Sequence, residues 1–378
     1  MGKNNPMNVE YYTYKVEFQE RGAGHIHGTL WLSLSNLEDL VYSANHKLIK
    51  SSALDPSKYT EEHVREYPFK GIKSAFHKLK NNEILLEEEK KALRNFVDEF
   101  TTVSTNESTV GSDVAKIAEE VNKHTHTKSC RKYDSQCRFQ FPRYPSTKTI
   151  IATPLVGKSA SERKSLLKEQ REILRKVGEV LNEEDVVKNI IESIGHSAEE
   201  PRDIYKINKR RRIEALLEKA GVTMEEYEKA LSYTATGVKV IQERDLTELY
   251  INSYNIEWLR AWNGNMDMST CFDYHAVITY ITDYFSKDDT GLMKLPKLVI
   301  EYNPSETFKE QMKLVANTFL THRQIGEAEA VYRLLPNMLL KNSNVACQWL
   351  SVGRRSELSK RWKLATEKEV EQGVGLIK

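Results

Sequence analysis

The sequence predicts an α+β fold in which an antiparallel sheet with flanking helices is interrupted by a long, mostly helical insertion. Three observations carry this prediction. Two runs of alternating polarity, 12–19 and 25–34, flank the glycine-containing segment 20–24, as expected for a β-hairpin. Helix-forming stretches with apolar stripes fill most of 36–236, including 37–49 and 159–233, whereas the polar segment 101–112 is expected to be a loop. Ser159 with Glu162 and Thr223 with Glu226 predict capping boxes. A mixed, strand-like pattern returns at 237–271, with a strand expected at 265–271.

The composition limits the class of protein but does not identify a binding partner. The chain has 378 residues, enough for two to three domains, with 39% hydrophobic and 29% charged residues. Its net charge of +2 does not by itself indicate nucleic acid. No apolar run approaches the length of a membrane span, so no membrane partner is expected. Four cysteines are too few for a disulfide framework, which favours a reducing, intracellular compartment.

The hairpin carries the first candidate site. One face of the predicted strands is apolar, and the other carries Lys15, Glu17, Gln19, His25, His27 and Thr29. If Gln19 lies opposite His25, then Glu17 lies opposite His27, within reach of a single ion. Two neutral imidazoles with a carboxylate or amide predict a divalent-metal site with positions left for substrate. The alternative is an ordinary pair of exposed histidines.

A second set of ligand types is concentrated in one short segment. His124, His126, Cys130 and Cys137 place four nitrogen and sulfur ligands within 14 residues. Zinc favours tetrahedral sets of this kind, and four protein ligands make such a site structural. The alternative is two exposed histidines with two buried free cysteines.

Two basic segments are candidates for contact with nucleic acid. Arg138 and Arg143 alternate with aromatic residues, a pattern that suits single strands because bases stack on rings while cations hold phosphates. The most concentrated cationic run is Lys209, Arg210, Arg211 and Arg212. A solvated helix face is the alternative interpretation of this run.

The segment 272–286 is predicted to be helical, and Tyr280 and Tyr284 lie one turn apart on the same side of it. Such a pair is by itself more typical of core packing than of catalysis.

Taken in order, these motifs resemble a known family. The stretch EFQERGAGHIHGTLWL, from Glu17 to Leu32, resembles the His-hydrophobic-His motif of HUH endonucleases, and most of all the replication-initiator domain of Helitron transposases. The segment CRFQFP from Cys137 is similar to a Helitron His/Cys stretch. Tyr280-x3-Tyr284, followed by Lys287, resembles the paired nucleophiles of that family.

The resemblance implies a fold, a reaction and a domain plan. The fold would be an HUH-type antiparallel sheet with a zinc-bearing insertion. Mg²⁺ or Mn²⁺ would be held by His25, His27 and Glu17, with Gln19 as substitute, and Tyr280 or Tyr284 would attack DNA with Lys287 steadying the phosphate. The implied units are a metal hairpin (1–35), a helical insertion (36–120), a zinc module (121–150), a basic helical insertion (151–236), the strand and tyrosine helix (237–295) and a C-terminal module (296–378).

The implied partner is single-stranded DNA, a transposon end or origin-like sequence, and the implied location is the nucleus. Family members carry a further strand upstream and a helicase downstream. The chain has no Gly-x4-Gly-Lys-Ser/Thr motif, so a separate helicase is expected. Two other functions stay open: a catalytically inactive, zinc-containing nucleic-acid-binding remnant, and a zinc-stabilised interaction protein without DNA affinity.

Overall fold

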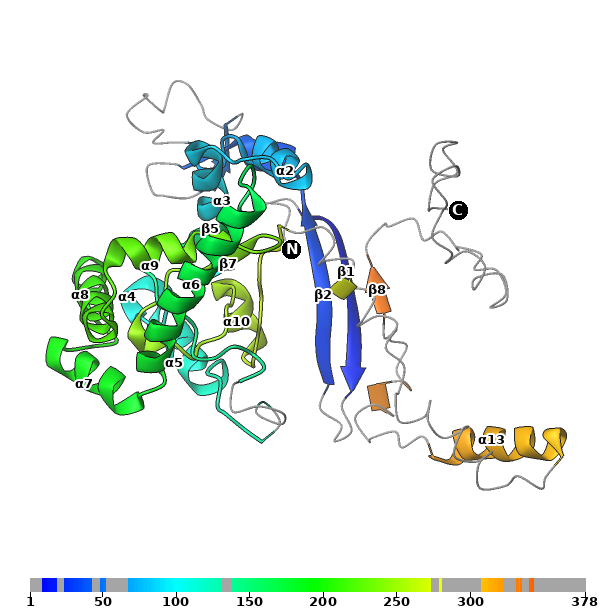
Figure 1. Ribbon diagram of the computed structural model, residues 1–378. Coiled ribbons are helices and arrows are strands. Elements are labelled where there is room, and N and C mark those ends of the chain that lie inside the picture. The colour runs from blue at the N-terminus through cyan, green and yellow to red at the C-terminus, as the bar shows by residue number, and fades with distance from the viewer. Residues whose placement is uncertain are drawn as a thin grey trace.

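The computed structural model describes residues 9–18, 24–42, 48–51, 67–128, 130, 137–272, 279–280, 307–322, 331–332, 334 and 340–342. Within these ranges the protein is a mixed α+β structure, with small sheets and several helices, so the predicted fold class is confirmed at this level (Figure 1). No helix among the described residues is both long and apolar enough to traverse a bilayer.

The long hairpin predicted from alternating polarity is present. β1 (Val9–Phe18) pairs antiparallel with β2 (Gly24–Leu32), and β8 (Leu340–Asn342) adds to the other side of β1, giving the order β2-β1-β8. The hairpin extends beside the helical part of the molecule, whereas α13 (Phe308–His322) lies apart from that part (Figure 1). The hairpin is anchored where Leu32 packs against a buried cluster that includes Leu37 and Leu93.

The segment after the hairpin differs from its predicted helix at 37–49. The structure instead has α1 (Leu34–Glu38) and two short antiparallel strands, β3 (Leu40–Tyr42) and β4 (Leu48–Lys50). Leu40 and Val41 are adjacent in sequence and both fully buried. An amphipathic helix would bury only one stripe, so burial on both faces of a short strand overrides the helix-like pattern.

Two helices complete this first core. They are α2 (Ile72–Lys80) and α3 (Glu87–Phe100). Their buried faces meet through Ile72, Leu93 and Val97. Three acidic residues in the first turn of α3 stabilise this helix by interacting with the positive N-terminal end of its dipole. The polar segment 101–112, expected to be a loop, contains the single turn α4 (Glu107–Val110) before α5 (Ser112–Val121).

The helical region predicted at 159–233 is confirmed. It consists of α6 (Ala160–Leu181), α7 (Glu184–Ile194), α8 (Arg202–Ala220) and α9 (Met224–Leu231). Capping boxes begin α6 and α9, with Ser159 paired to Glu162 and Thr223 paired to Glu226. Apolar residues of all four helices share one buried cluster with a small sheet, β5 (Ile150–Pro154), β6 (Tyr233–Thr234) and β7 (Lys239–Ile241), in the order β6-β5-β7.

The segment 237–272 has less strand than its pattern predicts. It contains β7, the 3-10 turn η3 (Leu246–Glu248) and α10 (Ile256–Trp262), and 263–272 forms neither helix nor strand. The strand predicted at 265–271 is therefore wrong. The backbone there is held by single contacts: the Met266 N–H donates to Asn122 Oδ1 at 2.7 Å, and the Met268 N–H donates to the Ser253 carbonyl at 2.8 Å.

Candidate metal centres

Within the part of the chain that the structure describes, His, Cys, Asp and Glu side chains form two groups whose ligand atoms lie within 4.8 Å of one another. One is Glu17, His25 and His27 on the hairpin, and the other is His124, His126, Cys130 and Cys137. Both groups are those predicted from sequence.

In the hairpin group the three side chains share the polar face of β1 and β2. Glu17 lies opposite His25, and Lys15 lies opposite His27. The Glu17 Oε2 atom is 3.4 Å from His25 Nε2 and 3.2 Å from His27 Nε2. One carboxylate oxygen therefore lies near both imidazoles, even though only one of the two histidines is its direct cross-strand partner.

The strand register differs from the predicted one by two residues. Glu17 was expected opposite His27, but Gly24 continues β2 and pairs with Phe18, which places Glu17 opposite His25. The close approach favours glycine, because a Cβ at this position would lie 3.1 Å from a carbon of the Phe18 ring. Since a shift of two keeps every side chain on its face, the metal-ligand face is preserved. Gln19, the alternative ligand, lies outside the described residues.

The structure brings Tyr280 to the hairpin group. The Tyr280 hydroxyl lies 2.9 Å from His27 Nδ1, and the two rings meet edge to face with centroids 6.1 Å apart. The two residues are 253 positions apart in sequence. Residues 279–280 are helical, as predicted, whereas Tyr284 and Lys287 lie outside the described residues.

Lys15 was not predicted as a site residue. It lies directly opposite His27, on the same face as the three ligands, which brings a cation beside them. The period-2 pattern already placed Lys15 on this face, so the signal that could have identified it was its alternation with Glu17.

The group Glu17, His25 and His27 could hold a metal ion. Adjacent ligands of an octahedral Mg²⁺ ion, each about 2.1 Å from the metal, lie roughly 3 Å apart. The separations of 3.2 and 3.4 Å around Glu17 Oε2 are close to this edge length. Two imidazoles and one carboxylate also leave coordination positions for water or a phosphate oxygen.

The second group has the donor set and spacing of a tetrahedral site. His124 Nε2 lies 3.4 Å from Cys137 Sγ, and His126 Nδ1 lies 3.6 Å from Cys130 Sγ. With Zn–S near 2.3 Å and Zn–N near 2.0 Å, a tetrahedral zinc ion separates its nitrogen and sulfur ligands by about 3.6 Å. The cluster could hold a metal ion such as zinc.

Aromatic packing and backbone pairing position these four ligands. The His124 ring stacks on Phe141 at 4.5 Å, and the His126 ring meets Tyr250 edge to face at 5.7 Å. The His124 N–H donates to the Tyr250 carbonyl at 2.7 Å, which joins the segment after α5 to the segment after η3. The Thr127 N–H donates to Cys130 Sγ at 3.2 Å, and Cys130 Sγ donates to the Thr127 carbonyl oxygen at the same distance.

The aromatic and cationic residues beside this cluster divide into an exposed and a packed pair. Phe139 is 44% exposed and carries the Arg138 guanidinium over its ring at 4.5 Å. Arg143 lies over the ring of the buried Phe141 at 4.9 Å. Burial lowers the pKa of the Arg143 guanidinium, and Asp267 opposes that shift. Arg138 therefore lies at an accessible surface, whereas Arg143 is largely a packing residue.

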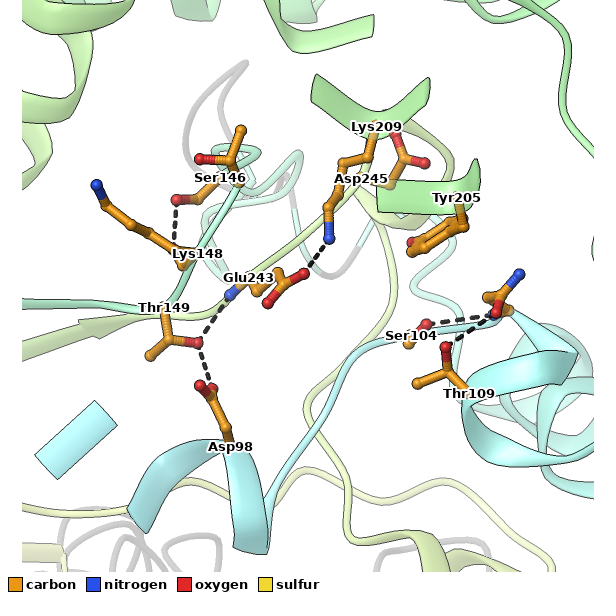
Figure 2. A network of polar contacts seen from close by, with 12 residues as sticks. Asp98, Ser104, Thr109, Ser146, Lys148, Thr149, Tyr205, Lys209, Glu243 and Asp245 are labelled. Carbon is orange, nitrogen blue, oxygen red and sulfur yellow. Dashed lines mark hydrogen bonds and ion pairs between the residues drawn. The ribbon is translucent and has the colours of Figure 1, made fainter. Parts of the chain in front are cut away.

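The predicted basic patch on α8 is corrected at two of its four positions. Lys209 and Arg212 are 2% and 0% exposed, and they pair with Glu243 and Asp245. Figure 2 shows Lys209 pointing from α8 toward Glu243, within a polar network that continues through Thr149 to Asp98. Lys209 and Arg212 thus form internal ion pairs. Of the four residues, only Arg210 and Arg211 are exposed and lie on an accessible face.

Comparisons of the chain with family models, with curated proteins and with solved structures returned no match.

Proposed function

We propose that the chain is a metal-dependent endonuclease that nicks and rejoins single-stranded DNA through a 5′-phosphotyrosine intermediate, as HUH endonucleases of the Helitron type do. The observation that carries the proposal is the 2.9 Å contact between Tyr280 and His27. It places a phenol oxygen beside the group Glu17, His25 and His27, and the order of these motifs is that of the family the sequence resembles. The resemblance also implies an HUH-type sheet and a zinc-bearing insertion, and both are part of this proposal.

The side chains present suit the ion that such a reaction needs. Mg²⁺ or Mn²⁺ would be held by His25 Nε2, His27 Nε2 and a Glu17 oxygen, the three atoms whose spacing fits an octahedral edge. Bound there, the ion would polarise the scissile phosphate and stabilise charge on the departing 3′ oxygen. Lys15, opposite His27, would contribute a fixed positive charge toward the same phosphate.

The chemistry assigned to Tyr280 is a transesterification that needs no ATP. The phenol oxygen forms a bond to phosphorus while the bond between phosphorus and the 3′ oxygen breaks. The phenol proton passes to solvent and the 3′ oxygen takes one up, so protons and charge balance. Because phosphodiester energy is kept in the tyrosine ester, a 3′-OH can reverse the step and join strands.

The resemblance assigns a second transfer to Tyr284 and phosphate contact to Lys287. A second nucleophile would allow a second strand to be cut before the first covalent end is released.

Features beside the zinc cluster support a path for the strand. The exposed Phe139 ring with Arg138 above it offers a stacking surface and a cation, the combination used for single-stranded nucleic acid. On α8, Arg211 adds an exposed positive charge, whereas the exposed Arg210 pairs with Glu214 of the same helix at 2.8 Å. These contacts are sequence-independent, so they account for affinity rather than for choice of target.

The proposal is tested by assaying for a covalent protein–DNA adduct. The full chain is incubated with Mn²⁺ and labelled single-stranded oligonucleotides that span candidate transposon ends, then separated on a denaturing gel. We expect the native chain and Tyr12→Phe, which loses a hydroxyl on the opposite face of the hairpin, to form a labelled protein band. The doubly substituted chain Tyr280→Phe with Tyr284→Phe should form none.

Two results would contradict the proposal in different ways. DNA binding by the native chain without any adduct would favour the inactive, zinc-containing nucleic-acid-binding remnant. An adduct that survives in the double variant would assign the nucleophile elsewhere.

A further inference from the structure

His27 differs from His25 in that both of its ring nitrogens face groups of the candidate site. Its Nε2 atom lies 3.2 Å from Glu17 Oε2, and its Nδ1 atom lies 2.9 Å from the Tyr280 hydroxyl. The side chain is largely enclosed, with 18% of its surface exposed. One imidazole therefore connects the ligand set to the proposed nucleophile.

A neutral imidazole carries one proton, so its two nitrogens have opposite roles. Without metal, the negative charge of Glu17 at 3.2 Å favours the proton on Nε2, although this contact lacks the alignment of a hydrogen bond. His27 Nδ1 then has a lone pair and accepts the hydrogen bond from Tyr280. In that state the phenol proton is held between the oxygen and the ring.

We propose that metal binding reverses the direction of the His27–Tyr280 hydrogen bond, an inference that rests on the metal site of the proposed function. A ligating Nε2 must offer its lone pair, so the ring proton moves to Nδ1 and is donated to the Tyr280 oxygen. The ring stays neutral in both states, and only its tautomer changes. His27 is thus a positioning residue for Tyr280 as well as a metal ligand.

This reversal changes what Tyr280 can do. In the reversed state His27 Nδ1–H donates to the Tyr280 oxygen. The hydroxyl proton of Tyr280 no longer bonds to His27 and can point at another acceptor. Histidines that ligate a metal commonly donate their second nitrogen to a partner that fixes the ring and strengthens the ligand. Here that partner is the nucleophile itself, so metal binding and alignment of Tyr280 strengthen each other by the same factor.

The reciprocity gives a test that does not depend on cleavage. Mn²⁺ affinity of the zinc-loaded full chain is measured by calorimetry and by electron paramagnetic resonance of the free ion. The site in question is the one removed by His25→Ala. We expect Tyr280→Phe, which leaves Nδ1–H without its acceptor, to weaken this site about tenfold, the lower end of the loss seen when such a partner is removed. Tyr12→Phe removes a hydroxyl from the opposite face of the hairpin and should leave the affinity unchanged.

A second measurement reads the tautomer directly. In ¹⁵N-histidine-labelled protein, with the His27 signals assigned by His27→Gln, addition of Mg²⁺ should move the protonated-nitrogen signal from Nε2 to Nδ1. The same tautomer with and without Mg²⁺ would overturn the reversal.

Failure of the inference can be told apart from failure of the proposed function. Equal Mn²⁺ affinity in Tyr280→Phe and the native chain overturns the coupling. The proposed nuclease function is then still decided by whether the covalent protein–DNA adduct forms. A coupled site in a chain that never forms an adduct overturns only the nuclease. The absence of any Mn²⁺ site sensitive to His25→Ala overturns both.

Discussion

The Asp98 carboxyl lies near the end of α3, inside the network of Figure 2. Its Oδ1 accepts a hydrogen bond from Thr149 Oγ1 at 2.5 Å. Burial raises the pKa of Asp98 from 3.8 to about 6, with the Thr149 hydrogen bond opposing the shift and Glu243 adding to it; Arg94 and Lys209 oppose it further. At neutral pH this group is therefore ionised at a cost to the folded state.

The sign of the effect follows from proton counting. Between about pH 4 and pH 6 the folded chain binds more protons at Asp98 than the unfolded chain, so this residue lowers stability as pH rises through that window. We expect Asp98→Asn, which keeps an acceptor for Thr149, to stabilise the protein at pH 8 by about 1 kcal/mol more than at pH 5. Urea unfolding at the two pH values measures the difference, and a gain that does not grow with pH would contradict it.

At the scale of single residues, the two ligand groups were predictable because each is local. Glu17, His25 and His27 belong to one hairpin, and the four His/Cys ligands lie within one segment. The Tyr280 contact joins residues 253 positions apart, and no periodicity encodes such a distance. It was expected only from the order of motifs in a family the chain resembles.

Secondary elements were predictable where local chemistry and tertiary burial agree. The capping boxes at Ser159 and Thr223 mark the starts of α6 and α9 correctly, because side chains satisfy the first backbone N–H groups whatever the surrounding fold. The segment 37–49 was misassigned because Leu40 and Val41 are buried on both faces, which only the tertiary structure decides.

In the run Lys209–Arg212, a count of charges does not show which side chains are buried and which are exposed. Tyr205, Lys209, Arg212 and Leu216 follow one another at intervals of three and four, so they form a single stripe of α8, and all four are buried. Arg210 and Arg211 point away from that stripe and are exposed. The apolar positions of α8 do not mark this stripe, because Ile204 and Ile207 are exposed while Lys209 and Arg212 are buried, so the division could not be predicted from the sequence.

The division on α8 predicts opposite effects for neighbouring arginines. Arg212→Met leaves the fully buried Asp245 without its cation and should destabilise the fold by about 3–5 kcal/mol. Arg211→Gln should change stability by less than about 0.5 kcal/mol but weaken binding of single-stranded DNA and reduce its salt dependence. Urea unfolding and fluorescence anisotropy at two salt concentrations separate the two effects. Similar stability losses in both variants would contradict the division.

At the scale of the whole molecule, the two candidate metal groups lie in regions of different packing. The His/Cys group is enclosed, with Cys130 and Cys137 buried together with Phe141 and packed against Tyr250. The hairpin exposes 48% of Ile26 and 41% of Leu30 on the face opposite its ligands. Few buried apolar contacts imply a low free energy of local opening, so the hairpin is the part whose stability an ion would raise most.

Hydrogen exchange should therefore reveal two separate local responses. With Mn²⁺ at about 100 times its dissociation constant, amides of β1 and β2 should exchange roughly a hundredfold more slowly, while those of α8 stay unchanged. Cys137→Ser should instead disrupt the His/Cys group and speed exchange around 122–128 and Tyr250, because backbone pairing joins those segments at the cluster. Cys271→Ser, which removes an exposed cysteine outside the cluster, is the matched control and should change neither region. If Mn²⁺ slowed exchange uniformly through α8 and the hairpin, opening would be global and the metal would not act on the hairpin alone.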